Sequence, residues 1–337
     1  MTATKNRRWV LARRPHGIVR DDDFRFVTEE VPAPGEGEFV VKVTHLSFDP
    51  TQRGWLVDAP SYLPPVQIGE VMRAGAVGEV VASKHAGFPV GVRVNGTFGW
   101  QDYAVSDGGG ARAVTIVRDS VSAEQALGVY GVTGLTAYFG LMDIGQPKAG
   151  DVVLVSGAAG ATGSVVVQIA KNLGCKVIGI AGGASKCTWV EGIAGADACI
   201  DYKAENVRER LRELAPRGVN VFFENVGGDI LEAGLDNLAQ NARIVLCGGI
   251  SGYNAVGELP PGPRNYMQLV IKRARMEGFI ILDYAPRFGE AVHKLAGWIA
   301  EGKMHTAVDM QEGLENAPAT LRRLFEGKNL GKQLLKL

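Results

Sequence analysis

The chain has 337 residues, of which 46% are hydrophobic and 21% are charged, the proportions of a globular protein with room for two domains. Its 36 basic and 36 acidic residues balance, so the net charge gives no reason to expect a nucleic acid as partner. The basic N-terminal segment lacks the apolar stretch of a secretory signal, and the uncharged run 152–170 is better explained by a strand, a glycine turn and a helix than by a membrane span. We expect a cytoplasmic protein that binds neither nucleic acid nor membrane.

Short strands dominate the first third of the sequence. Segment 7–15 is expected to be a strand with a basic edge, and alternating apolar and polar residues predict another strand at 38–48. Valine-rich segments broken by Gly, Pro and Asp continue the pattern at 74–84, 90–106 and 112–117. Such brief strands are typical of a small barrel or folded sheet.

From Asp151 onward, strands and helices alternate. This alternation predicts an α/β domain with a doubly wound parallel sheet, covered by helices on both faces. The last predicted elements are helices at 287–303 and 314–329 and a strand at 331–337. The preceding strands are predicted at 151–156, 176–181, 198–202, 219–228, 242–249 and 274–282, and the helices between them at 161–173, 185–194, 204–215 and 230–239.

The segment SGAAGATGS, Ser156 to Ser164, lies between the first predicted strand and helix of this domain. Gly160 and Gly163 occupy the second and third places of a G-x-G-x-x-G motif, while Ala158 occupies the first. Glycines let the backbone approach a pyrophosphate, and a helix N-terminus offers it unpaired N–H groups. A tight strand–helix turn would account for the glycines alone, but the strand–turn–helix–strand setting favours a nucleotide.

The end of the second strand indicates which dinucleotide is bound. Sites for NAD place Asp or Glu there to accept a hydrogen bond from the ribose 2′-hydroxyl, whereas this chain has no acidic residue between Asp151 and Glu191. Gly182 and Gly183 leave room for a 2′-phosphate, and Lys186 can supply a positive charge, although it could also be a solvated helix residue. We therefore predict NADPH/NADP+ as the cofactor.

Ligands of doubly wound sheets lie beyond the carboxyl ends of the strands. The later strand ends carry Asn225 and, in CGGISGY, Tyr253. Both are expected at the same crevice as the glycine turn, although Asn225 could be a turn residue and Tyr253 a packing residue.

Several segments together resemble one family, the medium-chain dehydrogenase/reductase superfamily, and within it the zinc-free branch of alkenal/one oxidoreductases, prostaglandin reductases and curcumin reductase. The resemblance covers nearly the whole chain. The segments that carry it are FDPTQRGW, IGEVMRAGAVGEVV, TGLTAYFGL, GAAGATGSVVVQIAK, FENVGG, LCGGISGYN and EGKNLGK.

This resemblance implies a GroES-like, mostly-β catalytic domain at 1–127, an NADP-binding Rossmann domain at 128–300 and a C-terminal segment, 301–337, that returns to the catalytic domain. It also implies a homodimer. The cofactor residues that it implies are Gly160, Ala161, Thr162 and Gly163 at the pyrophosphate, Lys186 and Tyr202 at the 2′-phosphate, and Asn225, Cys247, Gly248, Gly249, Ile250, Ser251, Tyr253, Phe279, Ile280, Ile281 and Asn329 along the rest of the cofactor.

No zinc site is expected. Zinc-dependent relatives use two cysteines and the histidine of a G-H-E motif, but all four cysteines here lie in the second half and QIGEV has no histidine. Conjugate reduction needs no metal: a hydride adds to the β-carbon of an α,β-unsaturated aldehyde or ketone, and a hydrogen-bond donor stabilises the enolate oxygen. A phenol stays protonated at neutral pH, so Tyr253 is the predicted catalytic donor.

One motif departs from the family. Many members have a tyrosine in D-P-Y-M-R near the substrate, whereas this chain has Thr51 and Gln52 in DPTQRGW, so its substrate preference is expected to differ. The alternatives are an NADPH quinone reductase and a nonenzymatic NADPH-binding protein, which an enone substrate panel would distinguish. A third alternative, a zinc-type alcohol dehydrogenase, would hold tightly bound zinc.

Overall fold

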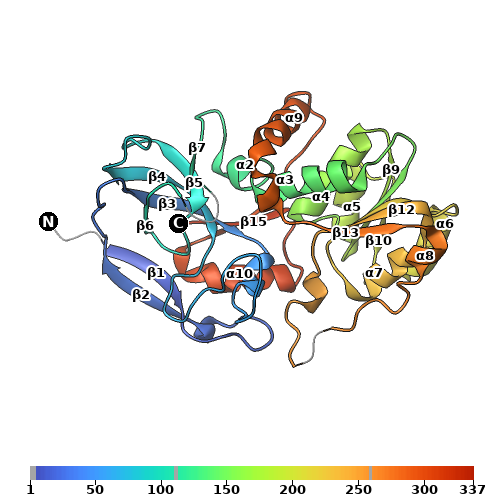
Figure 1. The fold of residues 1–337 in the computed structure, drawn as a ribbon, viewed down its shortest axis with the longest axis horizontal. Helices are drawn as coiled ribbons and strands as arrows, with labels where there is room; N and C mark the ends of the chain where they lie inside the picture. Colours follow the sequence, from blue (N-terminus) through green and yellow to red (C-terminus); the bar gives the residue numbers. More distant parts are fainter. Residues whose placement is uncertain (1–4, 110–112, 258–259) are drawn as a thin grey trace. The chain divides into compact units, whose positions relative to one another are not determined.

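The computed structural model describes residues 5–109, 113–257 and 260–337, which divide into two compact units (Figure 1). Unit 1 runs to Leu127 and also includes Val308–Leu337, whereas unit 2 comprises Gly128–Ala307. Residues 301–307 are held to unit 2 because Gln168 bonds His305 twice, accepting from its N–H at 2.6 Å and donating to its carbonyl at 2.9 Å. The boundary expected between residues 300 and 301, where the NADP-binding domain would end, stays a prediction.

Unit 1 is built around strands that bury side chains on both faces: Leu335 joins a larger hydrophobic cluster, whereas Leu334 joins a smaller one. Its main sheet has the order β14-β15-β3-β4-β5-β7, with β6 also paired to β3, and β1 and β2 form a separate antiparallel pair. The strands are β1 (Lys5–Leu11), β2 (Phe24–Glu30), β3 (Phe39–Phe48), β4 (Gly75–Ser83), β5 (Arg93–Thr97), β6 (Tyr103–Ser106), β7 (Thr115–Ile116), β14 (Val308–Glu312) and β15 (Lys332–Lys336). The helical segments are η1 (Asp21–Asp23), α1 (Thr51–Gly54), α2 (Ala123–Leu127), η5 (Leu314–Asn316) and α10 (Ala317–Phe325).

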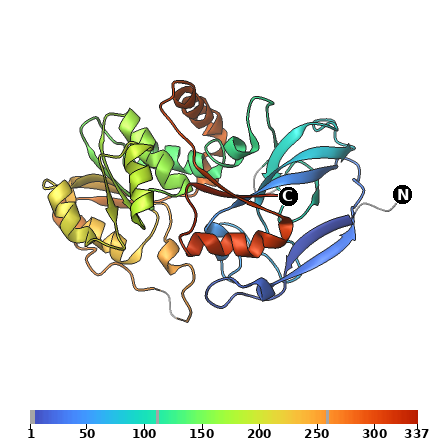
Figure 2. The ribbon, with the colours of Figure 1, turned by 180° about the vertical axis from the view of Figure 1, so that it is seen from behind.

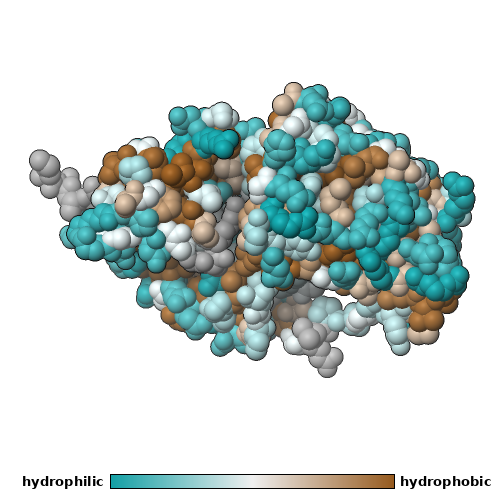
Figure 3. Space-filling view, turned by 45° about the horizontal axis from the view of Figure 1, so that its top comes forward, coloured by the Kyte–Doolittle hydropathy of each residue, from teal (hydrophilic) through white to brown (hydrophobic). Residues whose placement is uncertain are grey.

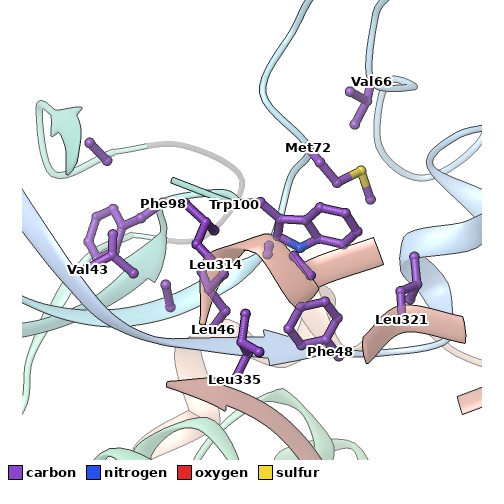
Figure 4. Packing of buried hydrophobic residues seen from close by; sticks show 14 of the residues in the cluster. Val43, Leu46, Phe48, Val66, Met72, Phe98, Trp100, Leu314, Leu321 and Leu335 are labelled. Atoms are coloured by element: carbon purple, nitrogen blue, oxygen red, sulfur yellow. The ribbon is translucent and has the colours of Figure 1, made fainter. Parts of the chain in front are cut away.

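The C-terminal strand completes this sheet. The strand at the end of the chain, β15, pairs antiparallel with β3 (Figure 2). Leu334 lies opposite Ser47, although the two are far apart in sequence. Trp100 and Phe48 pack at the centre of the unit 1 core with ring centroids 5.4 Å apart, and Leu321 of α10 and Leu335 of β15 join them (Figure 4). Burial of these apolar side chains explains why the end of the chain folds with its beginning.

Unit 2 contains six parallel strands in the order β10-β9-β8-β11-β12-β13, which confirms the predicted doubly wound sheet. Leu211 of α6 and Leu235 of α7 cover one face, while α4 packs on β8 and β9 from the other (Figure 1). The strands are β8 (Val152–Ser156), β9 (Lys176–Ala181), β10 (Ala198–Asp201), β11 (Val219–Glu224), β12 (Leu238–Leu246) and β13 (Arg275–Gly278). The helical segments are α3 (Val132–Phe139), η2 (Gly140–Gly145, a π-helix), α4 (Ala161–Asn172), α5 (Ala184–Gly192), α6 (Val207–Leu214), α7 (Gly228–Leu235), η3 (Ile250–Gly252), α8 (Gln268–Lys272), η4 (Ile281–Arg287) and α9 (Phe288–Ala300).

Some element bounds differ from the sequence-based predictions. The helix predicted at 230–239 ends at Leu235, because Leu238 already pairs with Val219 as the first residue of β12. The strand predicted at 274–282 ends at Gly278, and the chain then enters η4. Residue 112 of the strand predicted at 112–117, residues 1–4 of the N-terminal segment and residues 258–259 lie outside the described residues.

The surface mixes hydrophilic and hydrophobic residues on the face shown in Figure 3. The exposed hydrophobic side chains include Val270 and Ile271 of α8, whose exposed fractions are 64% and 57%. Within the described ranges, no helix is long and apolar enough to cross a membrane.

Candidate cofactor and catalytic site

The order of the sheet in unit 2 creates a switch point between β8 and β11. The chain continues from β8 to β9 on one side, and β11 pairs with β8 on the other, with Phe223 opposite Val155. Ser156 and Glu224 are the next residues of these strands and therefore lie side by side at the carboxyl edge. This edge is where doubly wound folds bind their ligands.

The glycine turn follows β8 at this edge. Gly160 is the N-cap residue of α4 and contributes no side-chain cap, while its N–H bonds the carbonyl of Gly157 at 2.9 Å. The first hydrogen bond of the helix runs from the Ser164 N–H to the Gly160 carbonyl, at 2.9 Å. The three preceding N–H groups, those of Ala161, Thr162 and Gly163, therefore have no partner within the helix. The predicted pyrophosphate residues thus lie together at a helix N-terminus, which suits an anion.

Gly163 is required by close packing. A Cβ atom at this position would lie 2.3 Å from the Gly157 carbonyl oxygen and 3.0 Å from the Ala158 Cα, both of which are backbone atoms. Ala158 in the first glycine place is accommodated because the facing residue of β9 is Gly179, where a Cβ would lie 2.9 Å from that of Ala158. Gly179 thus compensates for the alanine that occupies the first glycine place of the motif.

The carboxyl end of β9 is shaped by two glycines. Gly183 has φ of +101° and is the N-cap residue of α5, whose third residue is Lys186. A Cβ on Gly182 would lie 2.8 Å from the ring of Tyr202, which is half-exposed beside it. A side chain at position 182 would therefore require this ring to move, so Gly182 allows Tyr202 to lie close to the end of β9.

An acidic residue that the sequence analysis missed reaches this turn from the neighbouring strand. Asp201, at the end of β10, accepts hydrogen bonds through Oδ1 from the N–H groups of Gly183, at 2.8 Å, and Lys203, at 3.0 Å. It therefore fixes the turn between β9 and α5. The sequence feature that could have indicated this role is the position of Asp201 at the end of a predicted strand, next to Tyr202.

Glu224 is the second residue that sequence reasoning missed. It is fully buried at the end of β11, where Oε2 accepts from the Ser156 hydroxyl at 2.9 Å and Oε1 accepts from the N–H groups of Val226, at 2.6 Å, and Gly227. Burial raises the pKa of this carboxyl to about 7, although the three hydrogen bonds act in the opposite direction. An acid that ends the apolar run VFFE was the available signal.

Asn225 and the predicted segment 247–253 are docked on this same strand end. The Asn225 side chain donates to the Ser156 carbonyl at 2.7 Å. The Glu224 carbonyl accepts from the N–H groups of Cys247 and Gly248, at 2.9 and 3.2 Å. The structure therefore brings Asn225, Cys247 and Gly248 together beside the glycine turn.

The rest of that segment turns back through η3. Ser251 donates through its hydroxyl to the Val226 carbonyl at 2.6 Å, and Ile250 donates through its N–H to the Asn225 carbonyl at 3.3 Å. The phenol oxygen of Tyr253 accepts from the N–H of Gly249 at 3.3 Å. Donation to a substrate would use the phenol's own O–H.

Phe279, Ile280 and Ile281 follow β13 at the same edge of the sheet. The Phe279 ring meets that of Tyr284 edge-on, with centroids 6.1 Å apart. Gly140, at the start of the π-helix, makes room for it, because a Cβ there would lie 2.6 Å from the ring. The absence of a side chain at Gly140 thus lets the Phe279 ring pack against the π-helix and positions the segment Phe279–Ile281 within unit 2.

Two residues of interest belong to unit 1. Asn329 follows α10 and donates through its amide to the Gly331 carbonyl at 3.0 Å. Thr51, in place of the family tyrosine, has its hydroxyl against the phenol of Tyr62, which also accepts from Trp55 Nε1 at 3.3 Å. Each of these contacts is internal to unit 1.

No described group of three or more His, Cys, Asp or Glu side chains is arranged to hold a metal ion. The cysteines are free thiols, and burial raises the pKa of Cys175 to about 11 and that of Cys247 to about 12. These thiols are therefore protonated near neutral pH, which does not suit nucleophilic attack.

The fold and the strand-end site define a nucleotide-binding oxidoreductase. Residues 7–114 match the family model described as N-terminal domain of oxidoreductase, and residues 161–297 match the one described as zinc-binding dehydrogenase. The chain is 44% identical to the NADPH-dependent curcumin reductase of Escherichia coli over 99% of its own length and 97% of the relative's. It is 38% identical to prostaglandin reductase 1 of Oryctolagus cuniculus, over 98% and 93% of the two chains.

Solved structures agree with these relatives. The crystal structure of CurA in complex with NADPH from Vibrio vulnificus matches with a TM-score of 0.92 and 46% identity, over 98% of each chain. The chain belongs to the medium-chain dehydrogenase/reductase superfamily, in the branch of curcumin reductase and prostaglandin reductase 1. The GroES-like domain and the Rossmann-type domain expected from the sequence are confirmed.

Proposed function

We propose that this protein is an NADPH-dependent reductase of the C=C double bond of α,β-unsaturated aldehydes and ketones. The observation that carries the proposal is the 44% identity, over 99% of the chain, to an NADPH-dependent curcumin reductase. The similarity to prostaglandin reductase 1 supports the same reaction class.

The residues of unit 2 fit a dinucleotide phosphate. The glycine turn has no room for a Cβ at Gly163, and three N–H groups at the start of α4 are available to an anion. Lys186 lies in the first turn of α5, where a cation is disfavoured by the helix dipole by about 0.3–1 kcal/mol. A bound 2′-phosphate would reverse this penalty, and we assign that role to Lys186 and Tyr202.

NADPH supplies a hydride for the β-carbon of the substrate double bond. As negative charge develops on the carbonyl oxygen, the Tyr253 phenol donates a hydrogen bond to it, which stabilises the transition state more than the ground state. To the nicotinamide half of the cofactor we assign Asn225, the backbone of 247–251 and Phe279–Ile281. The enolate is then protonated at its α-carbon, and this proton comes ultimately from water.

A substrate panel tests the proposal. Purified protein is mixed with NADPH and with enals, enones such as 3-nonen-2-one, or quinones, and the loss of NADPH absorbance is followed. Turnover of the enals and enones supports the proposal. Turnover of quinones alone would favour quinone reductase activity, to which the 25% identity to an Escherichia coli quinone oxidoreductase points. Cofactor binding without any turnover would favour a nonenzymatic role.

The Tyr253 assignment has its own test. Tyr253→Phe keeps the ring but removes the donor, so kcat should fall by about 10- to 1,000-fold, with an unchanged circular dichroism spectrum. Unchanged kinetics would remove Tyr253 from the mechanism. We also propose a cytoplasmic homodimer, which light scattering and cell fractionation would check.

A further inference from the structure

We propose that Glu224 is a positioning residue for cofactor binding, whose carboxylate ties the end of β8 to the loop that follows β11 and thereby orders the segments that carry Asn225 and Tyr253. This inference rests on the proposed function, because the loops matter only if NADPH binds at this edge of the sheet. Glu224 belongs to the segment FENVGG that contributes to the family resemblance, but no cofactor or catalytic role was predicted for it.

The carboxylate holds two strands and one loop together. Through Oε2 it accepts from the hydroxyl of Ser156 at the end of β8, and that same hydroxyl oxygen accepts from the Asn225 N–H at 2.8 Å. Through Oε1 it accepts from Val226, at 2.6 Å, and Gly227. Gly227 has φ of +81° and is the N-cap residue of α7, so the carboxylate fixes a turn that only glycine adopts readily.

The ordering extends to the end of β12 through the backbone. The carbonyl oxygens of Glu224, Asn225 and Val226 accept hydrogen bonds from the backbone N–H groups of Cys247, Gly248, Ile250 and Ser251. A Cβ on Gly227 would lie 3.2 Å from the Ser251 hydroxyl, so these two loops are in close approach. Displacing residues 225–227 would therefore displace the segment that leads to Tyr253.

Burying a carboxylate costs free energy because its charge is removed from water. This cost indicates that Glu224 has a role other than filling the core. Its three hydrogen-bond donors are all neutral groups, so no positive charge offsets its removal from water. The preceding residues Val221, Phe222 and Phe223 are fully buried and apolar, and an apolar side chain would continue that pattern. Retaining an acid here is understandable if the loop geometry that it imposes is needed by a ligand.

The charge state of Glu224 decides how many donors it can satisfy. An ionised carboxylate accepts all three hydrogen bonds, whereas a protonated one must use one oxygen as donor and leaves a buried donor without its acceptor. The groups that face it are the Ser156 hydroxyl from β8, the protonated Cys247 thiol from β12 and the N–H groups of its own loop. Ordering of the loop should therefore weaken as the pH falls through the range in which Glu224 binds a proton.

The test compares NADPH dissociation constants, measured by fluorescence titration at pH 6 and pH 8, for wild type and Glu224→Gln. At pH 8 the variant lacks the carboxylate and should bind NADPH roughly tenfold more weakly, the effect of about one lost charge-assisted hydrogen bond. At pH 6 the wild type is itself protonated, so the two proteins should bind nearly equally. Titration of the cofactor's own phosphate affects both proteins and cancels in the ratio.

The matched control is Glu213→Gln, which removes an exposed carboxylate of α6 in the same unit. Its ratio to wild type should be one at both pH values. A ratio for Glu224→Gln that equals one at pH 8, or that is the same at both pH values, would overturn the inference, because a merely structural defect would not depend on the charge state.

A second variant covers the case in which Glu224→Gln does not fold. Ser156→Ala leaves the carboxylate but removes one of its donors and the acceptor of the Asn225 N–H, and it should also raise the NADPH dissociation constant at pH 8. Unchanged binding by folded Ser156→Ala would then overturn the inference. Failure of wild type to bind NADPH would instead refute the proposed function, so the two failures are distinguishable.

Discussion

Gly163→Ala tests the idea that close backbone packing shapes the phosphate-binding turn. The new Cβ would lie 2.3 Å from the Gly157 carbonyl oxygen, whereas ordinary contacts begin at 3.4 Å. The turn must therefore open by about 1 Å, since both contacting groups are backbone and cannot rotate away. Overpacking of this kind costs about 1–3 kcal/mol.

The expected result is a melting temperature lower by roughly 2–12 °C, because 1 kcal/mol corresponds to about 2–4 °C for a domain of this size. The NADPH dissociation constant should rise as well, because the N–H groups of the first turn of α4 move with the turn. Differential scanning calorimetry and fluorescence titration measure the two effects.

The matched control is Gly297→Ala in α9, where a Cβ meets nothing within 4 Å. Here alanine should raise stability by about 0.5–1 kcal/mol, because glycine is a poor helix former, and NADPH binding should not change. Equal effects of the two substitutions, in stability and in binding, would refute the argument from close packing.

Three further predictions concern charges. Lys186→Ala should weaken NADPH about 10- to 100-fold but leave NADH nearly unaffected in calorimetric titrations; equal losses would refute its assignment to the 2′-phosphate. The pKa of Glu224, raised from 4.5 to about 7, means that the folded state holds this proton more tightly than the unfolded one. The wild type should therefore lose stability as the pH rises from about 4.5 to 7, and Glu224→Gln should lack this loss of about 3 kcal/mol in urea denaturation at pH 5 and 8; parallel curves would contradict it. In unit 1, the buried Lys332 amino group pairs with Asp49, so Lys332→Met should cost about 3 kcal/mol, and the double variant with Asp49→Asn should recover part of it in the same assay.

The sequence by itself determined the class of fold and the family. Strand and helix periods are local properties of the chain, so the alternation after Asp151 could be recognised without coordinates. The glycine turn and the absence of an acid between Asp151 and Glu191 are likewise visible in one short segment. Gly160, Gly163 and Lys186 were therefore predicted as cofactor residues, and that assignment stays a prediction.

Only the tertiary structure decided which residues at the strand ends contact one another. Ser156 and Glu224 are far apart in sequence, and their hydrogen bond exists because β8 and β11 are neighbours in the sheet. Likewise, Tyr202 covers Gly182 because β10 lies beside β9. The physical reason is that side-chain contacts depend on which strands pair. Strand pairing is set by burial over the whole domain, so it cannot be deduced from a local sequence pattern.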